Sequence, residues 1–367
     1  MLPMSPVAQL RRMRLYPPLQ SGGGGRRRSR LTEGGSQAVP PPHSSPAALT
    51  RRAPCPLSQN PDRPEPIMAI RDFILLCAVC LVWGLNLVVT RWAVADMAIP
   101  PIFFAALRFL GVAVCLVPFL FPRPPNLRTL FFVSIMIGSV HFSLLFIGLQ
   151  HADASAAAVT GQLGVPFSTL MSMLFLGEVI RWRRAIGITL AFLGVIIIAL
   201  DPANFSVSFG LLYIIASAFI GSAGGIVMKR MPQISGLRMQ AWVGLFSFAP
   251  LFALSFAIEE NQLATYIDGG WMVWAASAFA ILGVSVFGHS AFYTLLKKYD
   301  VSLLSPLTLM TPIWGVIFGI ALLNEPLTPR LILGAIVSLS GVLVIALRPN
   351  EKMPEAALGK KAGAGDS

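Results

Sequence analysis

A close succession of long apolar runs, from residue 70 to residue 347, constrains this chain more than any other feature. Most runs are 17–24 residues long, which at a helical rise of about 1.5 Å per residue crosses a hydrocarbon core of about 30 Å. The runs lack the alternation of a membrane β-barrel, so they predict an all-α membrane protein. The ten expected spans are 72–91, 99–121, 129–149, 154–176, 185–200, 208–228, 239–257, 272–295, 301–323 and 331–347.

Composition supports a protein whose surface is partly covered by lipid. Hydrophobic residues make up 55% of the chain and charged residues only 12%, about half the charged fraction of a soluble protein. The net charge of +12 does not indicate nucleic-acid binding, because ten of the 28 basic residues precede residue 64 and most others lie in gaps between apolar runs. We therefore expect the lipid bilayer, and no nucleic acid, as a partner.

The charges in the gaps predict an orientation. Basic residues at the ends of membrane spans mark the cytoplasmic side, and with ten spans the basic and acidic loops alternate, which places both termini in the cytoplasm. We expect a multi-pass protein of the bacterial inner membrane. The basic loops contain Arg123, Arg128, Arg181, Arg183, Arg184, Lys229, Arg230, Arg238, Lys297 and Lys298, and the acidic loops Asp96, Asp153, Asp201, Glu259, Glu260, Asp268 and Glu325, together with Arg91 and Arg330.

The two ends of the chain differ from the apolar region. Residues 1–67 are rich in Pro, Gly, Ser and Arg, and such a segment buries too little apolar surface to offset its ordering entropy. We expect it to be disordered, or a misassigned extension that precedes a start at Met68. Its Arg content resembles a transit peptide, but its Pro and Gly runs oppose an amphipathic helix. Residues 348–367 are expected to form a cytoplasmic tail.

An internal repeat divides the apolar region into two related halves. An offset of 147 residues aligns Asp153–Leu200 with Asp300–Leu347 and places glutamate and glycine at matching positions. Five spans per repeat is an odd number, so the halves, 70–201 and 207–347, must be inserted in opposite directions. Inverted repeats are typical of secondary transporters, which bind substrate between the halves near the middle of the bilayer. The matching pairs are Glu178 with Glu325, Gly187 with Gly334 and Gly194 with Gly341.

Motifs of catalysis and of nucleotide binding are missing from the sequence. It contains no H-E-x-x-H, G-x-S-x-G or Walker A motif. Cys77 and Cys80 form a C-x-x-C pair inside an apolar run, without the context of a redox or metal motif. We therefore expect neither an enzyme, nor a metal, nor a cofactor, and any pumping must draw on an ion gradient or on the gradient of the substrate.

Four segments resemble the EamA family of the drug/metabolite transporter superfamily. The resemblance covers about residues 70–347 and is most like the O-acetylserine/cysteine exporter branch. It implies ten helices in two inverted five-helix repeats and an efflux function. The segments are "WGLNLVVTRWA" (Trp83–Ala93), "AALRF" (Ala105–Phe109), "FLGEVI" (Phe175–Ile180) and "LLNEPLT" (Leu322–Thr328).

Polar and aromatic residues inside the spans are the candidates for a substrate path, because a polar group in a bilayer is costly and needs a role. Arg108, deep in the second span, should bind a carboxylate of the substrate or of the protein. Structural alternatives are interhelical hydrogen bonding for Asn86, snorkelling for Arg91 and packing for the two histidines. The path candidates are Trp83, Asn86, Arg108, His141, Gln162, Trp242, His289, Tyr293 and Trp314; the hinge candidates are Pro166 and Pro312, and the charged motif positions are Arg91, Glu178 and Glu325.

These features together predict a secondary transporter that exports a small amino-acid-like metabolite by alternating access, with a proton as coupling ion carried by a histidine. Other substrates of the superfamily, such as nucleotide sugars, nucleobases or drugs, are the alternative. A membrane-embedded enzyme or sensor is a more distant one, for which an inverted duplication has no evident use.

Overall fold

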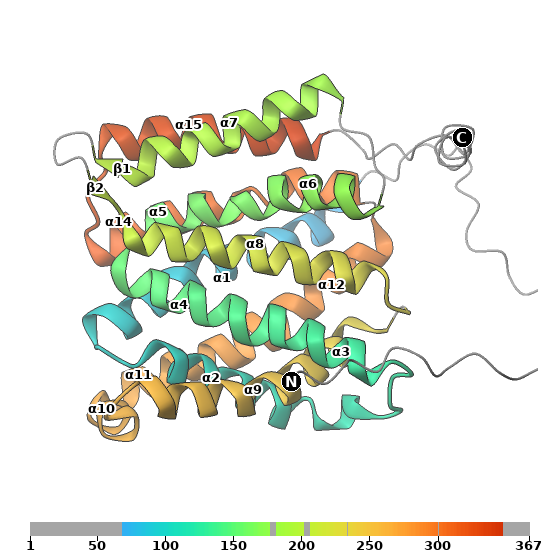
Figure 1. Cartoon of the computed structure of the whole chain (residues 1–367), viewed down its shortest axis with the longest axis vertical. Coiled ribbons are helices and arrows are strands. Elements are labelled where there is room, and N and C mark those ends of the chain that lie inside the picture. The colour runs from blue at the N-terminus through green and yellow to red at the C-terminus, as the bar shows by residue number, and fades with distance from the viewer. Residues whose placement is uncertain (1–67, 177–180, 202–205, 233, 300, 348–367) are drawn as a thin grey trace, which may run out of the picture. The chain divides into compact units, whose positions relative to one another are not determined.

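The computed structural model describes residues 68–176, 181–201, 206–232, 234–299 and 301–347 (Figure 1). In this part of the chain, nine helical segments are long and apolar enough to cross a membrane, and Pro101–Cys115 is a shorter apolar helix. The prediction of an all-α membrane protein is confirmed, and the expected count of ten spans is approximately met.

The first half contains the first five spans. Its second span is shorter than the predicted 99–121, because Pro118 lacks a backbone N–H and disfavours helix at the residue before it. The helices are α1 (Ile70–Arg91), α2 (Pro101–Cys115), α3 (Leu127–Ser134), α4 (His141–His151), α5 (Ala154–Thr160), α6 (Gly164–Leu176) and α7 (Trp182–Ala199), with π-helical η1 (Trp92–Asp96) and η3 (Ile135–Val140) and 3-10 helical η2 (Val117–Leu120) and η4 (Gly161–Leu163).

The second half repeats this order. A two-residue antiparallel ladder, β1 (Leu200–Asp201) with β2 (Ser206–Val207), joins it to the first half. The helices are α8 (Phe209–Lys229), α9 (Gly236–Ile258), α10 (Gln262–Asp268), α11 (Gly270–Ala278), α12 (His289–Lys298), α13 (Val301–Leu307), α14 (Met310–Leu323) and α15 (Pro329–Ala346), with π-helical η5 (Phe279–Gly288) between α11 and α12.

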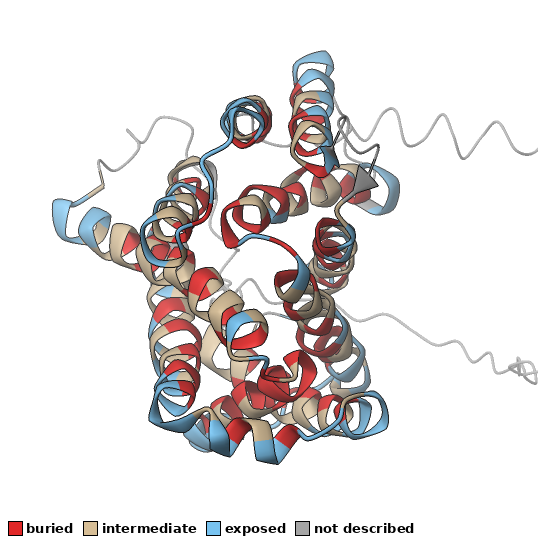
Figure 2. Ribbon diagram, turned by 90° about the vertical axis from the view of Figure 1, so that its left-hand side faces the viewer, coloured by how far each residue is buried: buried red, intermediate tan, exposed pale blue. Residues whose placement is uncertain are grey.

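Large apolar side chains face outward as well as inward. Phe209 and Trp271 are 75% and 77% exposed, and Figure 2 shows exposed residues along helices whose other faces are buried. In water such a surface would be an aggregation hazard, whereas in a bilayer it faces acyl chains. The distribution therefore agrees with membrane insertion.

The contact between α7 and α15, which lie side by side in Figure 1, shows that the halves are inverted. A methyl group added at Gly187 would come within 2.8 Å of the Gly341 carbonyl oxygen, and one added at Gly334 within 2.6 Å of the Gly194 carbonyl oxygen. Contact positions rise along α7 while they fall along α15, so the two helices run antiparallel. Since they are equivalent spans of the repeat, the halves point in opposite directions.

Other helix pairs follow the same symmetry. The pair α2 and α9 joins the second spans of the halves, and α4 packs on α8 as α1 packs on η5 and α12. The packing of the fourth spans departs from this symmetry. The fourth spans pack closely through α5 and α14, but among the described residues the equivalent pair α6 and α13 makes no comparable contact. The fourth spans are therefore together at one end and apart at the other.

Helix irregularities also repeat in the two halves. The fourth span of the first half is interrupted at Gly161–Leu163, just before Pro166. The equivalent span is interrupted between Leu307 and Met310, just before Pro312. Discontinuous helices at matching places are a feature of transporters built from inverted repeats. The hinge role of the two prolines stays a prediction.

Candidate functional site

Arg108 is the central side chain of a polar cluster within the bundle. It is the eighth residue of α2 and only 3% exposed. Its Nε donates to Ser285 Oγ at 3.2 Å, and its guanidinium lies 4.8 Å from the centre of the Phe142 ring. Among the described residues, no carboxylate pairs with it, and Nη1 lacks a hydrogen-bond partner. Because a buried charge is costly unless it is paired, we expect this guanidinium to bind an anion.

The two half-buried histidines of the spans, His141 and His289, lie within electrostatic reach of Arg108. Each begins the α-helix that follows a π-helical segment, His141 after η3 and His289 after η5. Their Nδ1 atoms lie 2.9 Å from backbone carbonyls, of Ser217 and of Val284 respectively. A carbonyl only accepts, so we assign the proton to Nδ1. The Nε2 atom of each neutral ring is then left as an acceptor.

Three polar side chains follow one another along α1. Trp83, Asn86 and Thr90 are spaced at i, i+3 and i+7, which places them on one face of the helix. Trp83 packs against His289, with ring centres 5.3 Å apart. Trp83 Nε1, Asn86 Oδ1 and Thr90 Oγ1 are all buried without a hydrogen-bond partner within the described chain. We call this row the α1 stripe; it starts beside His289 and ends next to Arg91.

The structure brings together only some of the predicted path residues. Trp83, Arg108, His141, His289 and Tyr293 form or adjoin the cluster, Tyr293 through a ring contact with His289 at 6.3 Å. Three others make different contacts: Trp242 lies against Phe246, Trp314 lies against Phe318 and beside Gly84 of α1, and Gln162 sits at the break in the fourth span.

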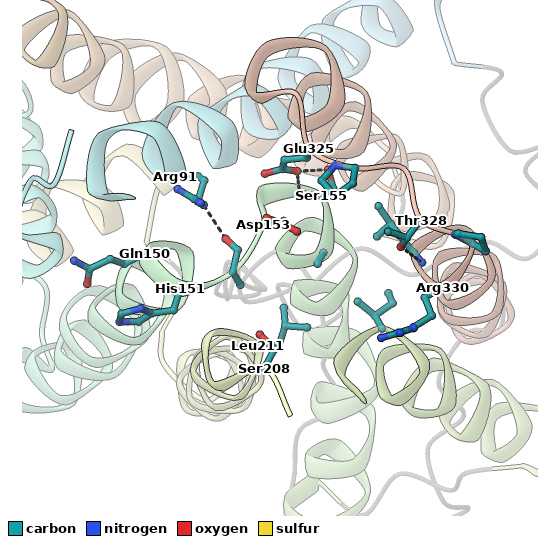
Figure 3. Close-up of a pocket in the computed structure, with 16 residues that line it drawn as sticks. Arg91, Gln150, His151, Asp153, Ser155, Ser208, Leu211, Glu325, Thr328 and Arg330 are labelled. Atoms are coloured by element: carbon teal, nitrogen blue, oxygen red, sulfur yellow. Dashed lines mark hydrogen bonds between the residues drawn. The ribbon is translucent and has the colours of Figure 1, made fainter. Parts of the chain in front are cut away.

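A pocket of about 690 Å³ opens at one end of the bundle (Figure 3). We call this end the pocket end. Arg91, at the end of α1, donates to the Ala152 carbonyl at 3.0 Å and pairs with Asp96 at 3.2 Å. The pocket is lined by Arg91, Gln150, His151, Ala152, Asp153, Ser155, Ala156, Ile198, Ser208, Leu211, Glu325, Pro326, Thr328, Pro329, Arg330 and Leu331.

The opposite end of the bundle has its own interhelical links. Lys298 pairs with Asp72, and this hydrogen bond raises the pKa of Lys298 above its ordinary value, so the side chain stays cationic. Arg230 donates to the Phe175 carbonyl, and Arg238 donates to the Phe121 carbonyl at 3.5 Å. These links place the start of α1 and the end of α8 at the same end, as an inverted repeat requires.

Two glutamates at the pocket end connect the halves. The Glu325 carboxylate accepts from the backbone N–H groups of Ala154 and Ser155, at 2.6 and 2.8 Å, and from Ser155 Oγ. Glu259 accepts from the backbone N–H groups of Ile102 and Phe103 at 2.7 and 3.0 Å. Both carboxylates belong to the second half and bind the start of a first-half helix. Glu178, the partner of Glu325 in the repeat, lies outside the described residues.

Sequence reasoning missed several members of these sites. Ser285 and Phe142 contact Arg108, and Thr90 extends the α1 stripe, but serine, threonine and phenylalanine are common in apolar spans. For Thr90, its spacing from Asn86 was an available signal. For Ser285 there was none, since its contact joins residues 177 positions apart.

The fold and the buried polar cluster together define a membrane transporter of the inverted-repeat class. The chain belongs to the EamA-like transporter family, whose model matches residues 71–200 and again residues 208–347. Each matched segment contains one five-span repeat.

Several curated relatives that match most of the chain are named as transporters or efflux pumps. The chain is 26% identical over 288 residues to "Probable amino-acid metabolite efflux pump" of Escherichia coli (strain K12), covering 76% of this chain and 95% of the relative. It is 27% identical to the protein of the same name in Salmonella typhimurium, over 76% and 95% of the two chains. "Uncharacterized transporter" of Archaeoglobus fulgidus is 25% identical over 75% of this chain and 99% of that one.

A solved structure described as "Crystal structure of protein" shares the fold, with a TM-score of 0.50 and 20% identity over 76% of this chain and 96% of that chain. The family and the names of the relatives identify a multi-pass membrane transporter, which is compatible with the expectation that the chain is not an enzyme.

Proposed function

We propose that this transporter exports a small metabolite that carries both a carboxylate and an amino group, by alternating access between its two halves. The observation that carries the proposal is Arg108, a buried guanidinium without a carboxylate partner among the described residues. The names of the two efflux-pump relatives support an amino-acid-like substrate. O-acetylserine and cysteine are the compounds that the resemblance to the exporter branch favours. The orientation expected from the loop charges places both termini in the cytoplasm and the pocket end outside.

The cluster offers complementary groups for such a zwitterion. Arg108 Nη1 would donate to the substrate carboxylate, in a dry environment where a charge-assisted hydrogen bond is strong. The ammonium group would donate to acceptors near it, which are Asn86 Oδ1 and the free Nε2 of His289 or His141. Trp83 and Phe142 would enclose the aliphatic part.

The same geometry supports proton exchange. A histidine that has taken up a proton on Nε2 can no longer accept from an ammonium group, and the two positive charges repel. Substrate and proton would therefore occupy the cluster in turn, so protons entering from outside would drive the substrate out. A substrate that has a carboxylate but no ammonium group would bind Arg108 without competing with the proton for the histidine.

The test uses vesicles with the purified protein inserted in their membrane in the inside-out orientation, so that export appears as uptake into the vesicle. Radiolabelled amino acids and their O-acetyl derivatives are compared with the corresponding amines, which lack the carboxylate. We expect uptake of the acids to exceed that of the amines and to rise when the vesicle lumen is acidified. Arg108→Gln should lower uptake about tenfold to a hundredfold, as expected for losing roughly 1.5–3 kcal/mol from a hydrogen bond to a charged group.

The matched control is Arg128→Gln. Arg128 is exposed at the start of α3, and the same substitution there should leave uptake unchanged. Equal uptake by the Arg108→Gln variant and the wild type would overturn the site assignment. Uptake of the amines at the rate of the acids would instead favour a different substrate class.

A further inference from the structure

We infer that Glu325 is a releasable latch, a positioning residue that holds the fourth spans of the two halves together at the pocket end and so separates the pocket from the Arg108 cluster. The inference rests on the proposed alternating-access function and names the contact that must open for substrate to pass. It commits to one bond set, the one between the Glu325 carboxylate and the start of α5.

Local sequence directs the Glu325 side chain into this contact. Helix α14 ends at Leu323, and Asn324 adopts the left-handed conformation with φ 54°, which asparagine tolerates better than most residues. The chain then turns back, so that the Glu325 N–H lies 3.3 Å from the Gly319 carbonyl. The side chain enters between α14 and α5, where it is buried (Figure 3).

The space for the carboxylate depends on Gly319. A methyl group added there would collide with the Glu325 carboxylate and with Ser155 Oγ. The buried Glu325 carboxylate is thus enclosed by α14, by α5 and by the turn between α14 and α15. Its three donors all belong to the other half of the molecule.

The symmetry of the fold shows why this contact distinguishes two states. The pair α5 and α14 is closed at the pocket end, while its equivalent, α6 and α13, makes no comparable contact in the described chain. The fourth spans are therefore closed on one side only. The latch lies on the closed side, and a transporter that exchanges its open and closed sides must break it.

The pocket is separated from the cluster in this state. Of the described residues, those that line the pocket include Glu325 and Ser155 but not Arg108, His141 or His289. Gly161 lies six residues beyond Ser155 in the same span, about 9 Å deeper at the helical rise. It is exposed, and a Cβ atom built on it meets nothing within 4 Å. A cysteine at this position therefore fits the structure and reports access from the pocket end.

Glu259 provides the matched comparison. It also is a second-half carboxylate that accepts from two backbone N–H groups of the first half at the pocket end. It links α9 to α2, however, and does not line the pocket. A purely structural role for such caps predicts the same effect for both residues, whereas a latch predicts an effect for Glu325 alone.

The experiment measures labelling of a Gly161→Cys reporter in the full-length protein, in membrane vesicles, with the four native cysteines replaced. A membrane-impermeant maleimide is applied to the face that carries the pocket. We expect Glu325→Gln and Gly319→Ala each to speed labelling about tenfold or more, since each lost charge-assisted bond shifts the balance by about that factor. Glu259→Gln should label at the wild-type rate.

A second arm closes the latch covalently. A Ser155→Cys and Glu325→Cys pair is joined by a short thiol cross-linker that reduction can cleave. Joining the pair should stop labelling at Gly161→Cys and also stop export of the transported substrate, and reduction should restore labelling.

The results separate the latch from the proposed function. Unchanged labelling in both Glu325→Gln and Gly319→Ala, equal acceleration by Glu259→Gln, or undiminished labelling after cross-linking would each overturn the latch. If labelling follows the expectation but no amino-acid-like compound is exported by the wild type, the latch stands and the proposed substrate is wrong.

Discussion

At the scale of single residues, the unusual feature is a set of buried polar atoms that the chain leaves without partners. In folded proteins, most buried polar side chains are hydrogen-bonded, and each exception needs a reason. Asn86 Oδ1 and Arg108 Nη1 are two such atoms in the described residues. Their cost to stability is understandable if they bind substrate, because a group already satisfied within the protein would have to break a bond first.

Asn86→Leu separates the two roles of this side chain. If Asn86 serves substrate binding, the substitution should leave stability unchanged or raise it by about 1 kcal/mol, because an amide whose buried oxygen has no partner is replaced by an apolar group of similar size. Export should fall about tenfold or more. Thermal unfolding in detergent and vesicle uptake measure the two effects. A loss of stability with normal export would show that Asn86 is instead a structural interhelical bond.

At the scale of helices, α7 and α15 form the tightest pair, and glycine makes it possible. Small residues let membrane helices approach until backbone meets backbone. The sequence predicted close packing at Gly187 and Gly194. In the structure each of them packs on the repeat equivalent of the other, Gly187 on Gly341 and Gly194 on Gly334.

Gly187→Ala should therefore destabilise the protein. Its methyl group would meet the Gly341 carbonyl oxygen at 2.8 Å and Ile345 Cγ1 at 2.9 Å, and overpacking of this kind costs about 1–3 kcal/mol. The matched control is Gly225→Ala in α8, where a Cβ atom meets nothing within 4 Å. That change should be neutral or stabilise by up to about 1 kcal/mol through helix propensity. Denaturation midpoints in detergent compare the two variants, and equal midpoints would contradict the packing argument.

At the scale of the whole molecule, the charged loops predict an orientation that can be checked directly. Ser208 lines the pocket at the start of α8, and Arg128 lies at the start of α3, toward the opposite end. In a cysteine-free background, Ser208→Cys should react with an impermeant reagent in intact cells. Arg128→Cys should react only after permeabilisation. The reverse pattern would place the termini outside.

How much was predictable from the sequence differs between scales. The spans, the two halves and their inversion followed from apolar run lengths, loop charges and a 147-residue offset, all of which are readable along one dimension. The predicted second span extended beyond Cys115, where α2 ends, although Pro118 indicates an earlier end of the helix. The meeting of Arg108 with Ser285, and of Glu259 with Ile102, was beyond reach, because each joins residues more than 150 positions apart through packing alone.

The glycine contact between α7 and α15 has a consequence for turnover. Gly187 meets Gly341 and Gly194 meets Gly334. When the two halves exchange their conformations, each of these contacts is replaced by the other, so the same pair of contacts is present again. The free energy of these contacts is then equal in the inward-facing and outward-facing states and favours neither state. Strengthening the contact between α7 and α15 therefore does not trap the carrier in one of its two states. Weakening it should reduce the amount of folded protein while the equilibrium between the inward-facing and outward-facing states stays the same.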